Sequence, residues 1–266
     1  MGRGAEYGST SVTSIEQWVR PVPTDTTGQL AREDVSLLDG LDGTEGVASL
    51  GHELRRNYIS PEEIAVVLEA FGADRLATHL RANKLPTKVS IRHGEFGEAL
   101  AGALFRRVKR YCVPIMKLRY KQGRNQPTHL ADILAFRLRV DPPVVAVLEA
   151  KTRTTRDLAI GVEAYSQLQT TLRDGLGQAI TFVAARLAER NPALATRILV
   201  LLNGACVIER HIVLVYDEAA WDEKVIQRLR PLVLEESTAT IIRLARLRQL
   251  VASAYCAAEE DVSRVT

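Results

Sequence analysis

Apolar and polar positions alternate with clear periods in the middle of the chain. Residues 92–110 place apolar side chains at four-residue steps from Phe96 to Val108. This spacing predicts an amphipathic helix with a basic last turn. Residues 113–121, VPIMKLRYK, alternate apolar and polar side chains, which is the period of a half-buried strand.

Two further strands are predicted directly after this region. Residues 131–140 read ADILAFRLRV and residues 144–153 read VVAVLEAKTR, and an Asp-Pro-Pro turn separates them. A short turn between two β-rich runs is typical of a hairpin. We therefore expect the two strands to pair antiparallel, so that the start of the first lies beside the end of the second.

The remaining patterns predict helices and buried strands in alternation. Ser60, Pro61 and Glu63 form a capping sequence at the start of a helix. Apolar β-rich runs predict buried strands at 197–204 and 210–217. Helices are predicted at 157–175, 177–190, 221–230 and 237–257.

This order of elements is typical of an α/β fold with a mixed central sheet flanked by helices. Residues 1–45 are rich in Gly, Ser, Thr and Asp, and we expect a loosely structured N-terminal arm with one short strand near 14–19. Residues 46–90 are predicted to form a helical subregion, and residues 91–266 the main domain.

Composition restricts the class of protein only weakly. The net charge of +3 is mildly basic, which is compatible with a polyanionic partner without requiring one. No apolar run reaches the roughly 18 residues that span a bilayer, so we expect no membrane association. The three cysteines are scattered and Met1 is not followed by an apolar leader, which favours the cytoplasm.

Charged residues at the ends of the predicted hairpin strands are the strongest chemical signal. Asp132 opens the first strand, while Glu149 and Lys151 end the second and share one face by alternation. Antiparallel pairing would bring Asp132 and Glu149 within reach of one metal ion. A similar acid-rich stretch, Asp222-Glu223-Lys224, lies in an amphipathic helical pattern and is interpreted as a surface pair.

Glu95 and Glu98 lie at the start of the amphipathic helix. Glu98 falls near the border of the apolar face, so it can either join the strand carboxylates or simply favour the helix dipole. For Glu95 the dipole is the simpler explanation.

A helix Glu, then a strand Asp, then Glu-x-Lys on the next strand resembles the PD-(D/E)xK nuclease superfamily over residues 92–169. The resemblance implies a restriction-endonuclease-like core and a Mg²⁺-dependent deoxyribonuclease, with Mn²⁺ as an alternative ion. It implies Asp132 and Glu149 as metal ligands, Lys151 as the catalytic lysine and Glu98 as a further catalytic carboxylate and metal ligand. The proline of the superfamily motif is replaced by Ala131.

A narrower resemblance is carried by GEFGEALAGALF, by an Asn-x-Pro-x-His-x-x-Asp segment and by LEAKT. The segment comprises Asn125, Pro127, His129 and Asp132. This order is similar to the HamA nuclease family of the Hachiman anti-phage system. It implies a superfamily-2 helicase partner of the HamB type, and the chain itself contains no Gly-rich loop ending in Gly-Lys-Ser or Gly-Lys-Thr.

Candidate DNA contacts precede the hairpin. Lys117, Arg119 and Lys121 would share one face of the predicted strand at 113–121, either as an ordinary exposed face or as phosphate-binding residues. His129 can assist the site or belong to loop structure.

Three functions remain open from the sequence. The first is a DNA nuclease subunit of an anti-phage complex under the control of a helicase. The second is an inactive nuclease-fold subunit that binds DNA or a partner protein. The third is a nuclease of restriction or repair.

Overall fold

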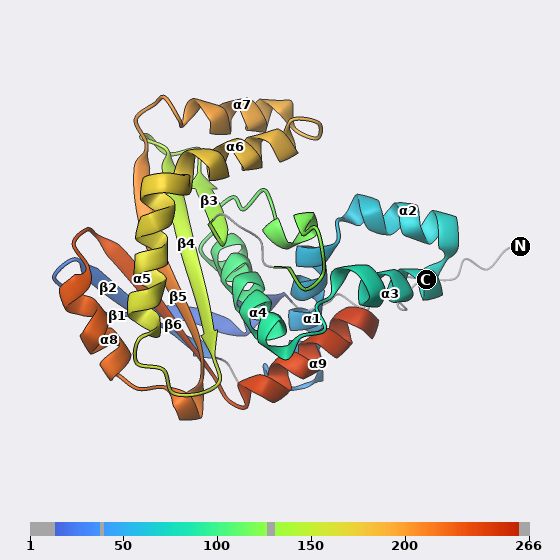
Figure 1. Cartoon of the computed structure of the whole chain (residues 1–266), viewed down its shortest axis with the longest axis horizontal. Coiled ribbons are helices and arrows are strands. Elements are labelled where there is room, and N and C mark those ends of the chain that lie inside the picture. The colour runs from blue at the N-terminus through green and yellow to red at the C-terminus, as the bar shows by residue number, and fades with distance from the viewer. Residues whose placement is uncertain (1–13, 38–39, 127–130, 261–266) are drawn as a thin grey trace, which may run out of the picture.

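The computed structural model describes residues 14–37, 40–126 and 131–260 of the 266-residue chain. These residues form a six-stranded sheet in the order β1-β2-β6-β5-β4-β3, flanked by helices (Figure 1). The strands are β1 (Val19–Thr27), β2 (Leu30–Leu37), β3 (Ile133–Arg137), β4 (Val144–Arg153), β5 (Val207–Asp217) and β6 (Ser237–Leu244). The pairs β1–β2 and β3–β4 are antiparallel and the three pairs between them are parallel, which confirms the predicted mixed sheet.

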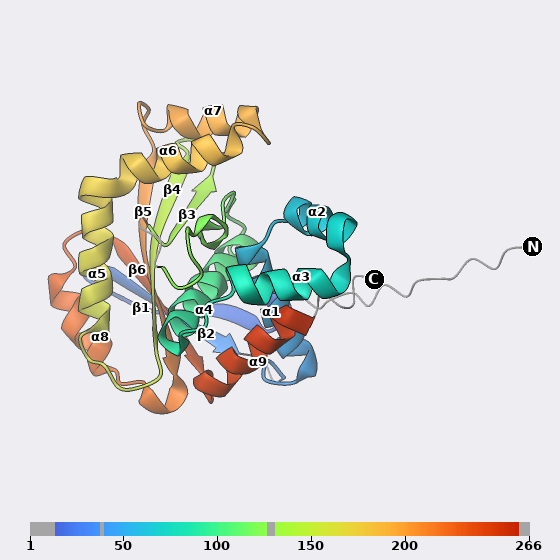
Figure 2. The ribbon, with the colours of Figure 1, turned by 45° about the vertical axis from the view of Figure 1, so that its right-hand side comes forward.

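Helices pack on both faces of this sheet. Alternate residues of β4 belong to two separate apolar clusters, since Ala146 and Leu148 face one helical layer and Val145 and Val147 face the other. Strand β5 is buried on both faces in the same way. The first layer contains α1 (Thr44–Tyr58), α4 (Val89–Ala103) and α9 (Leu247–Glu260), with α9 lying against α1 (Figure 2). The second contains α5 (Ile160–Thr170), α6 (Leu176–Leu187), α7 (Pro192–Val200) and α8 (Lys224–Leu229).

The helical pair α2 (Pro61–Phe71) and α3 (Ala73–His79) lies beside α1. The predicted cap of α2 is confirmed, because the Ser60 hydroxyl accepts a hydrogen bond from the Glu63 amide at 3.1 Å. The β3–β4 hairpin is also confirmed, with Ile133 opposite Leu148 in the register.

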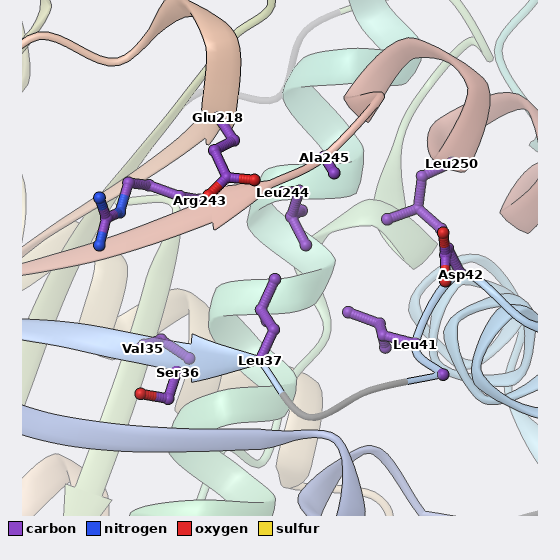
Figure 3. Close-up of a pocket in the computed structure, with 11 residues that line it drawn as sticks. Val35, Ser36, Leu37, Leu41, Asp42, Glu218, Arg243, Leu244, Ala245 and Leu250 are labelled. Atoms are coloured by element: carbon purple, nitrogen blue, oxygen red, sulfur yellow. The ribbon is translucent and has the colours of Figure 1, made fainter.

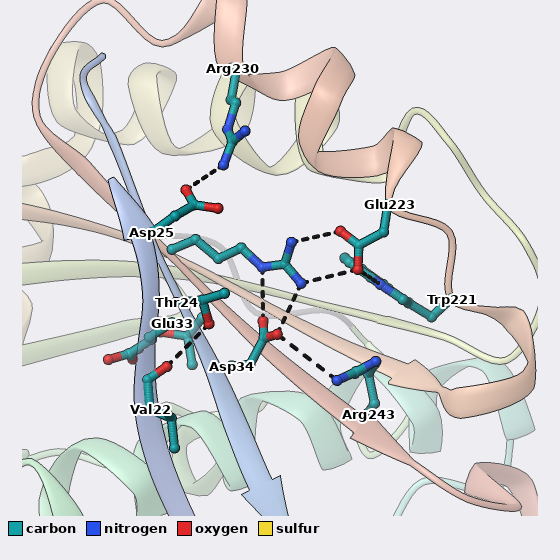
Figure 4. A network of polar contacts seen from close by, with 11 residues as sticks. Val22, Thr24, Asp25, Glu33, Asp34, Trp221, Glu223, Arg230 and Arg243 are labelled. Atoms are coloured by element: carbon teal, nitrogen blue, oxygen red, sulfur yellow. Dashed lines mark hydrogen bonds and ion pairs between the residues drawn. The ribbon is translucent and has the colours of Figure 1, made fainter. Parts of the chain in front are cut away.

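Within the predicted N-terminal arm, residues 19–37 form a β-hairpin rather than loose structure, while residues 1–13 lie outside the described residues. Strand β1 carries Pro21 and Pro23 and is mostly exposed, as suits an edge strand. Arg32 on β2 holds the hairpin against the C-terminal half, because its guanidinium pairs with Asp34 at 2.9 Å and with Glu223 at 2.6 Å (Figure 4). The short strand expected near residues 14–19 is a 3₁₀ turn, Ile15–Gln17, followed by β1.

Three predicted elements differ in type. Residues 113–121 contain a 3₁₀ helix, Lys117–Tyr120, rather than a strand. The first half of the apolar run at 197–204 ends α7, which Asn191 caps through Leu194 N at 3.0 Å, and the second half is a turn. The predicted helix at 237–257 is β6 followed by α9. Short apolar runs fit a buried helix and a buried strand equally well, and tertiary packing decides between them.

Helix α4 approaches β4 most closely at Gly97. A Cβ added at Gly97 would meet the Thr152 Oγ1 atom at 2.0 Å and Thr152 Cβ at 3.4 Å, whereas a Cβ at Gly94 on the same helix meets nothing within 4 Å. Thr152 is β-branched and buried, so it cannot move aside cheaply. This close approach places Glu98, the next residue, against the sheet.

Gly97→Ala is therefore expected to lower the free energy of unfolding by about 1–3 kcal/mol through overpacking. The matched change Gly94→Ala is expected to raise it by about 0.5–1 kcal/mol, because alanine is the better helix former. Urea denaturation of both variants measures the difference. Equal effects of the two substitutions would contradict the close packing of α4 on β4.

Candidate active site

The site lies where β3 begins and β4 continues beyond it. Asp132 immediately precedes β3, and its Oδ2 atom accepts a hydrogen bond from the Ala150 amide of β4 at 3.0 Å. This bond extends the β3–β4 pairing by one step and fixes the Asp132 carboxylate beside Glu149 and Lys151. The proximity of these three residues, predicted from the hairpin, is confirmed.

Lys117 places an ammonium group between two carboxylates. Its Nζ atom lies 2.9 Å from Asp132 Oδ1 and 3.4 Å from Glu98 Oε2. The Lys117 side chain is only 10% exposed, so this ion pair is shielded from water. Lys117 thus bridges two carboxyl groups, one from α4 and one from the start of β3, and its single charge offsets one negative charge.

Glu149 and Lys151 form the second half of the cluster. Lys151 Nζ lies 2.6 Å from Glu149 Oε1, and the Glu149 side chain is 5% exposed whereas that of Lys151 is 28% exposed. Lys151 therefore reaches solvent while the carboxylate beside it does not.

Burial and like charge both raise the pKa values of the glutamates. Burial raises the pKa of Glu98 to about 8, and the nearby Asp132 carboxylate adds to the effect against the opposing charge of Lys117. Burial raises the pKa of Glu149 to about 7, again with Asp132 adding and Lys151 opposing. Burial lowers the pKa of Lys117, but Glu98 and Asp132 more than offset this, so the Lys117 pKa is raised and the ammonium stays charged.

The chemistry of these donors suits a hard cation. Glu98, Asp132 and Glu149 supply carboxylate oxygens, which Mg²⁺ and Mn²⁺ prefer. Across residues 14–37, 40–126 and 131–260 no three His, Cys, Asp or Glu side chains are already arranged around one ion position. The Lys117 ammonium lies between the Glu98 and Asp132 carboxylates in this arrangement.

Lys121 belongs to a separate buried network. It forms an ion pair with Glu95 and donates to the Arg124 carbonyl at 2.7 Å. Glu95 also accepts a 2.5 Å hydrogen bond from the Tyr58 hydroxyl, which lies 2.7 Å from the Tyr255 hydroxyl. Glu95 thus joins α4 to α1 and α9, a role beyond the helix dipole.

The prediction that Lys117, Arg119 and Lys121 share one face of a strand is wrong. The three residues lie in and after a 3₁₀ turn, and Arg119 donates to the Arg56 carbonyl at 2.6 and 2.9 Å. The ammonium groups of Lys117 and Lys121 form ion pairs with buried carboxylates. Binding of DNA by these residues stays a prediction.

Asn125 has a structural role that the sequence did not indicate. Its Oδ1 atom accepts a hydrogen bond from the Thr87 amide at 3.0 Å, and its Nδ2 donates to the Thr87 hydroxyl at 2.9 Å. These bonds tie the loop after Lys121 to the segment that enters α4. Pro127 and His129 lie outside the described residues.

A cavity of about 400 Å³ lies elsewhere, at the ends of β2 and β6, with Leu37 and Leu244 among its lining residues (Figure 3). None of the clustered carboxylates lines it. The candidate catalytic residues therefore lie outside this cavity, at the start of β3.

The raised pKa of Glu149 predicts a pH-dependent stability. The folded chain holds this proton more tightly than the unfolded chain, so the wild type loses stability as pH rises from the ordinary value of 4.5 through about 7. Glu149→Gln cannot ionise and is expected to be more stable than the wild type by about 1–3 kcal/mol at pH 8 and equally stable at pH 4. Thermal unfolding in EDTA at both pH values measures this.

Glu69→Gln, which changes an exposed carboxylate on α2, is the control and is expected to show no such difference. A gain at pH 4 as large as that at pH 8 would contradict the assignment of the raised pKa.

Comparison with known protein families gives a match. No helix among the described residues is long and apolar enough to cross a membrane. No curated protein matches the chain. The profile of the HamA family matches residues 40–246, a span that includes Glu98, Lys117, Asp132, Glu149 and Lys151. Because this match covers well over half of the sequence, the chain belongs to the HamA family.

Proposed function

We propose that this chain is the metal-dependent DNA nuclease subunit of an anti-phage defence complex. Membership of the HamA family supports the defence role. One observation carries the nuclease proposal: Asp132, Glu149 and Lys151 gather at the open end of β4, with Glu98 approaching from α4. This combination matches the residue types of the PD-(D/E)xK nucleases.

The proposed metal ligands are Asp132 and Glu149, with Glu98 as a further carboxylate. A bound Mg²⁺ or Mn²⁺ would polarise the scissile phosphate and lower the pKa of a bound water. The Ala150 amide holds Asp132 in place through its Oδ2 atom, which leaves Oδ1 as the atom that Lys117 now contacts.

Lys151 has the position expected of a lysine that assists hydrolysis. Its ammonium contacts Glu149 and is partly exposed, so it can meet a substrate phosphate without losing its partner. A positive charge at this point would orient an attacking water and offset the negative charge that develops on the phosphate.

Lys117 would compete with a metal ion. Any ion that bound Glu98 and Asp132 together would share their oxygens with the Lys117 ammonium, which lies within 3.4 Å of both. This contact favours a second candidate function, a subunit that binds DNA or a partner without cutting. Cleavage assays separate the two.

The proposed partner is a superfamily-2 helicase of the HamB type. The sequence contains no Gly-rich loop ending in Gly-Lys-Ser or Gly-Lys-Thr, so an ATP-driven step would need another protein. A helicase that loads DNA into the site would also restrict cutting to the DNA that it delivers.

Supercoiled plasmid tests the proposal. The wild-type chain with Mg²⁺, assayed alone and with its helicase, is expected to nick or cut the plasmid in at least the second case, and EDTA is expected to stop it. Asp132→Ala, Glu149→Ala and Lys151→Ala are each expected to reduce the rate by about 100-fold or more, because each removes a metal ligand or a charge from the transition state.

The matched control is Lys224→Ala, which removes an exposed lysine that follows two acidic residues on the protein surface. It is expected to cut at the wild-type rate. A folded Asp132→Ala or Glu149→Ala variant that cuts at the wild-type rate would refute the site, and no cutting under any condition would favour the binding subunit.

A further inference from the structure

A basic cavity lies at the far end of β3 from Asp132. It is a cavity of about 590 Å³ between the end of β3, the segment that follows the π-helical turn Leu104–Val108, and α7. This volume is typical of ligand sites. No Asp or Glu is among the described residues that line it, whereas its arginines are Arg110, Arg137, Arg139 and Arg197.

The Arg137 guanidinium stacks on an aromatic ring. Its guanidinium carbon lies 4.0 Å from the centre of the Tyr111 ring. The Tyr111 hydroxyl donates a hydrogen bond to Glu209 on β5, which fixes the ring against the sheet. Stacking on a fixed ring limits the rotamers of Arg137 and leaves the edge of its guanidinium free to donate.

The other arginines are also weakly neutralised. Arg197 on α7 donates to the Leu138 carbonyl at 2.7 Å, which directs its guanidinium toward the end of β3 without cancelling its charge. Arg139 has no ion pair among the described contacts, and Arg110 has only a 3.7 Å contact with Glu16. Arg110, Arg139 and Arg197 therefore share one cavity with little compensation, while Arg137 also lies near the Glu209 carboxylate that Tyr111 contacts.

Repulsion between these groups makes a polyanion the favoured occupant. Guanidinium groups match phosphate oxygens with two parallel hydrogen bonds, and like charges gathered in a cavity with no acidic lining residue gain most from a ligand of opposite sign. By contrast, Lys117 and Lys121 near the carboxylates already have buried acidic partners. Besides Lys151, further phosphate-binding charge must then come from outside the carboxylate cluster.

The separation of the two sites fits a nucleic-acid strand. Arg137 follows Asp132 by five residues along a strand, which is about 17 Å at the rise of a β-strand. That distance corresponds to the rise of about five base pairs. Side chains five residues apart leave opposite faces of a strand, so a nucleic-acid strand would reach both sites along the edge of β3, the last strand of the sheet.

We propose that Arg137, Arg139 and Arg197 bind the phosphate backbone of nucleic acid at a position several nucleotides from the bond that is cut. The choice of nucleic acid rests on the proposed nuclease function, whereas the choice of phosphate rests on the arginine cavity itself. The site contributes affinity and register without taking part in the chemistry.

Fluorescence anisotropy in EDTA tests this without any cleavage. The probe is a fluorescein-labelled 20-nucleotide DNA, single-stranded and as a duplex, with the full chain at low salt. The double change Arg137→Glu with Arg139→Glu is expected to weaken binding by about tenfold or more. Arg139→Gln alone disturbs no described contact. For the single strand it is expected to reduce the slope of log Kd against the logarithm of the salt concentration by about 0.7.

The charge-matched control is Arg75→Glu with Arg228→Glu, two exposed positions on α3 and α8. It is expected to change Kd by less than about twofold. Equal weakening by both double variants would show that only total charge matters and would overturn the site. Displacement of the probe by ATP or inorganic triphosphate at an equal phosphate concentration would assign the cavity to a free phosphate ligand instead.

The result of this binding experiment does not depend on whether the chain cuts DNA. Binding that depends on Arg137 and Arg139 in a chain that never cuts would retain this site and reject the nuclease. Cutting by a chain whose binding ignores both arginines would reject this site and retain the nuclease.

Discussion

Mutual repulsion among Glu98, Asp132 and Glu149 is the constraint on which the rest of the site depends. Partly buried carboxylates this close to one another must be protonated, paired or bound to a cation. The fold nevertheless brings them together, through the Gly97 contact of α4 on β4 and through the hydrogen bond from Ala150 to Asp132. Lys117 supplies the cation in the structure as it stands.

The surrounding elements make this arrangement rigid. Glu95, one turn before Glu98, is held by Lys121 and Tyr58, so α4 is fastened to α1 at the level of the site. The Tyr58 hydroxyl in turn meets Tyr255 on α9. Strand β5, buried on both faces, supports β4 along its whole length. The geometry of the carboxylates is thus built on packed secondary structure rather than on loops.

Sequence patterns were sufficient for the hairpin and for the residues that it brings together. The β-rich runs around Asp141–Pro142 allow only one local pairing, and that pairing sets Asp132 beside Glu149. The alternation at 113–121 was misleading, because a 3₁₀ turn there points Lys117 at the carboxylates instead of at solvent. No local pattern could reveal this, since the partner residues lie on α4 and at the start of β3.

The parallel strand β6 was missed for a related reason. It lies between β2 and β5, so nearly every side chain is buried, and only Ala245 and Arg246 separate it from α9. So short a break does not mark a boundary in the pattern. The β1–β2 hairpin was missed because its exposed, polar edge strand lacks alternation and depends on ion pairs with residues about 190 positions away, as between Arg32 and Glu223.

The central claim is that these carboxylates form a cation site. A metal ion that binds there must displace the protons that Glu98 and Glu149 hold. Isothermal titration calorimetry of Mg²⁺ into the metal-free chain at pH 7, repeated in two buffers of different ionisation enthalpy, counts those protons. The raised pKa values of Glu98 and Glu149 predict the release of about one proton for each ion bound, and Asp132→Asn is expected to weaken the binding. Binding without proton release, or unchanged binding in Asp132→Asn, would contradict the account.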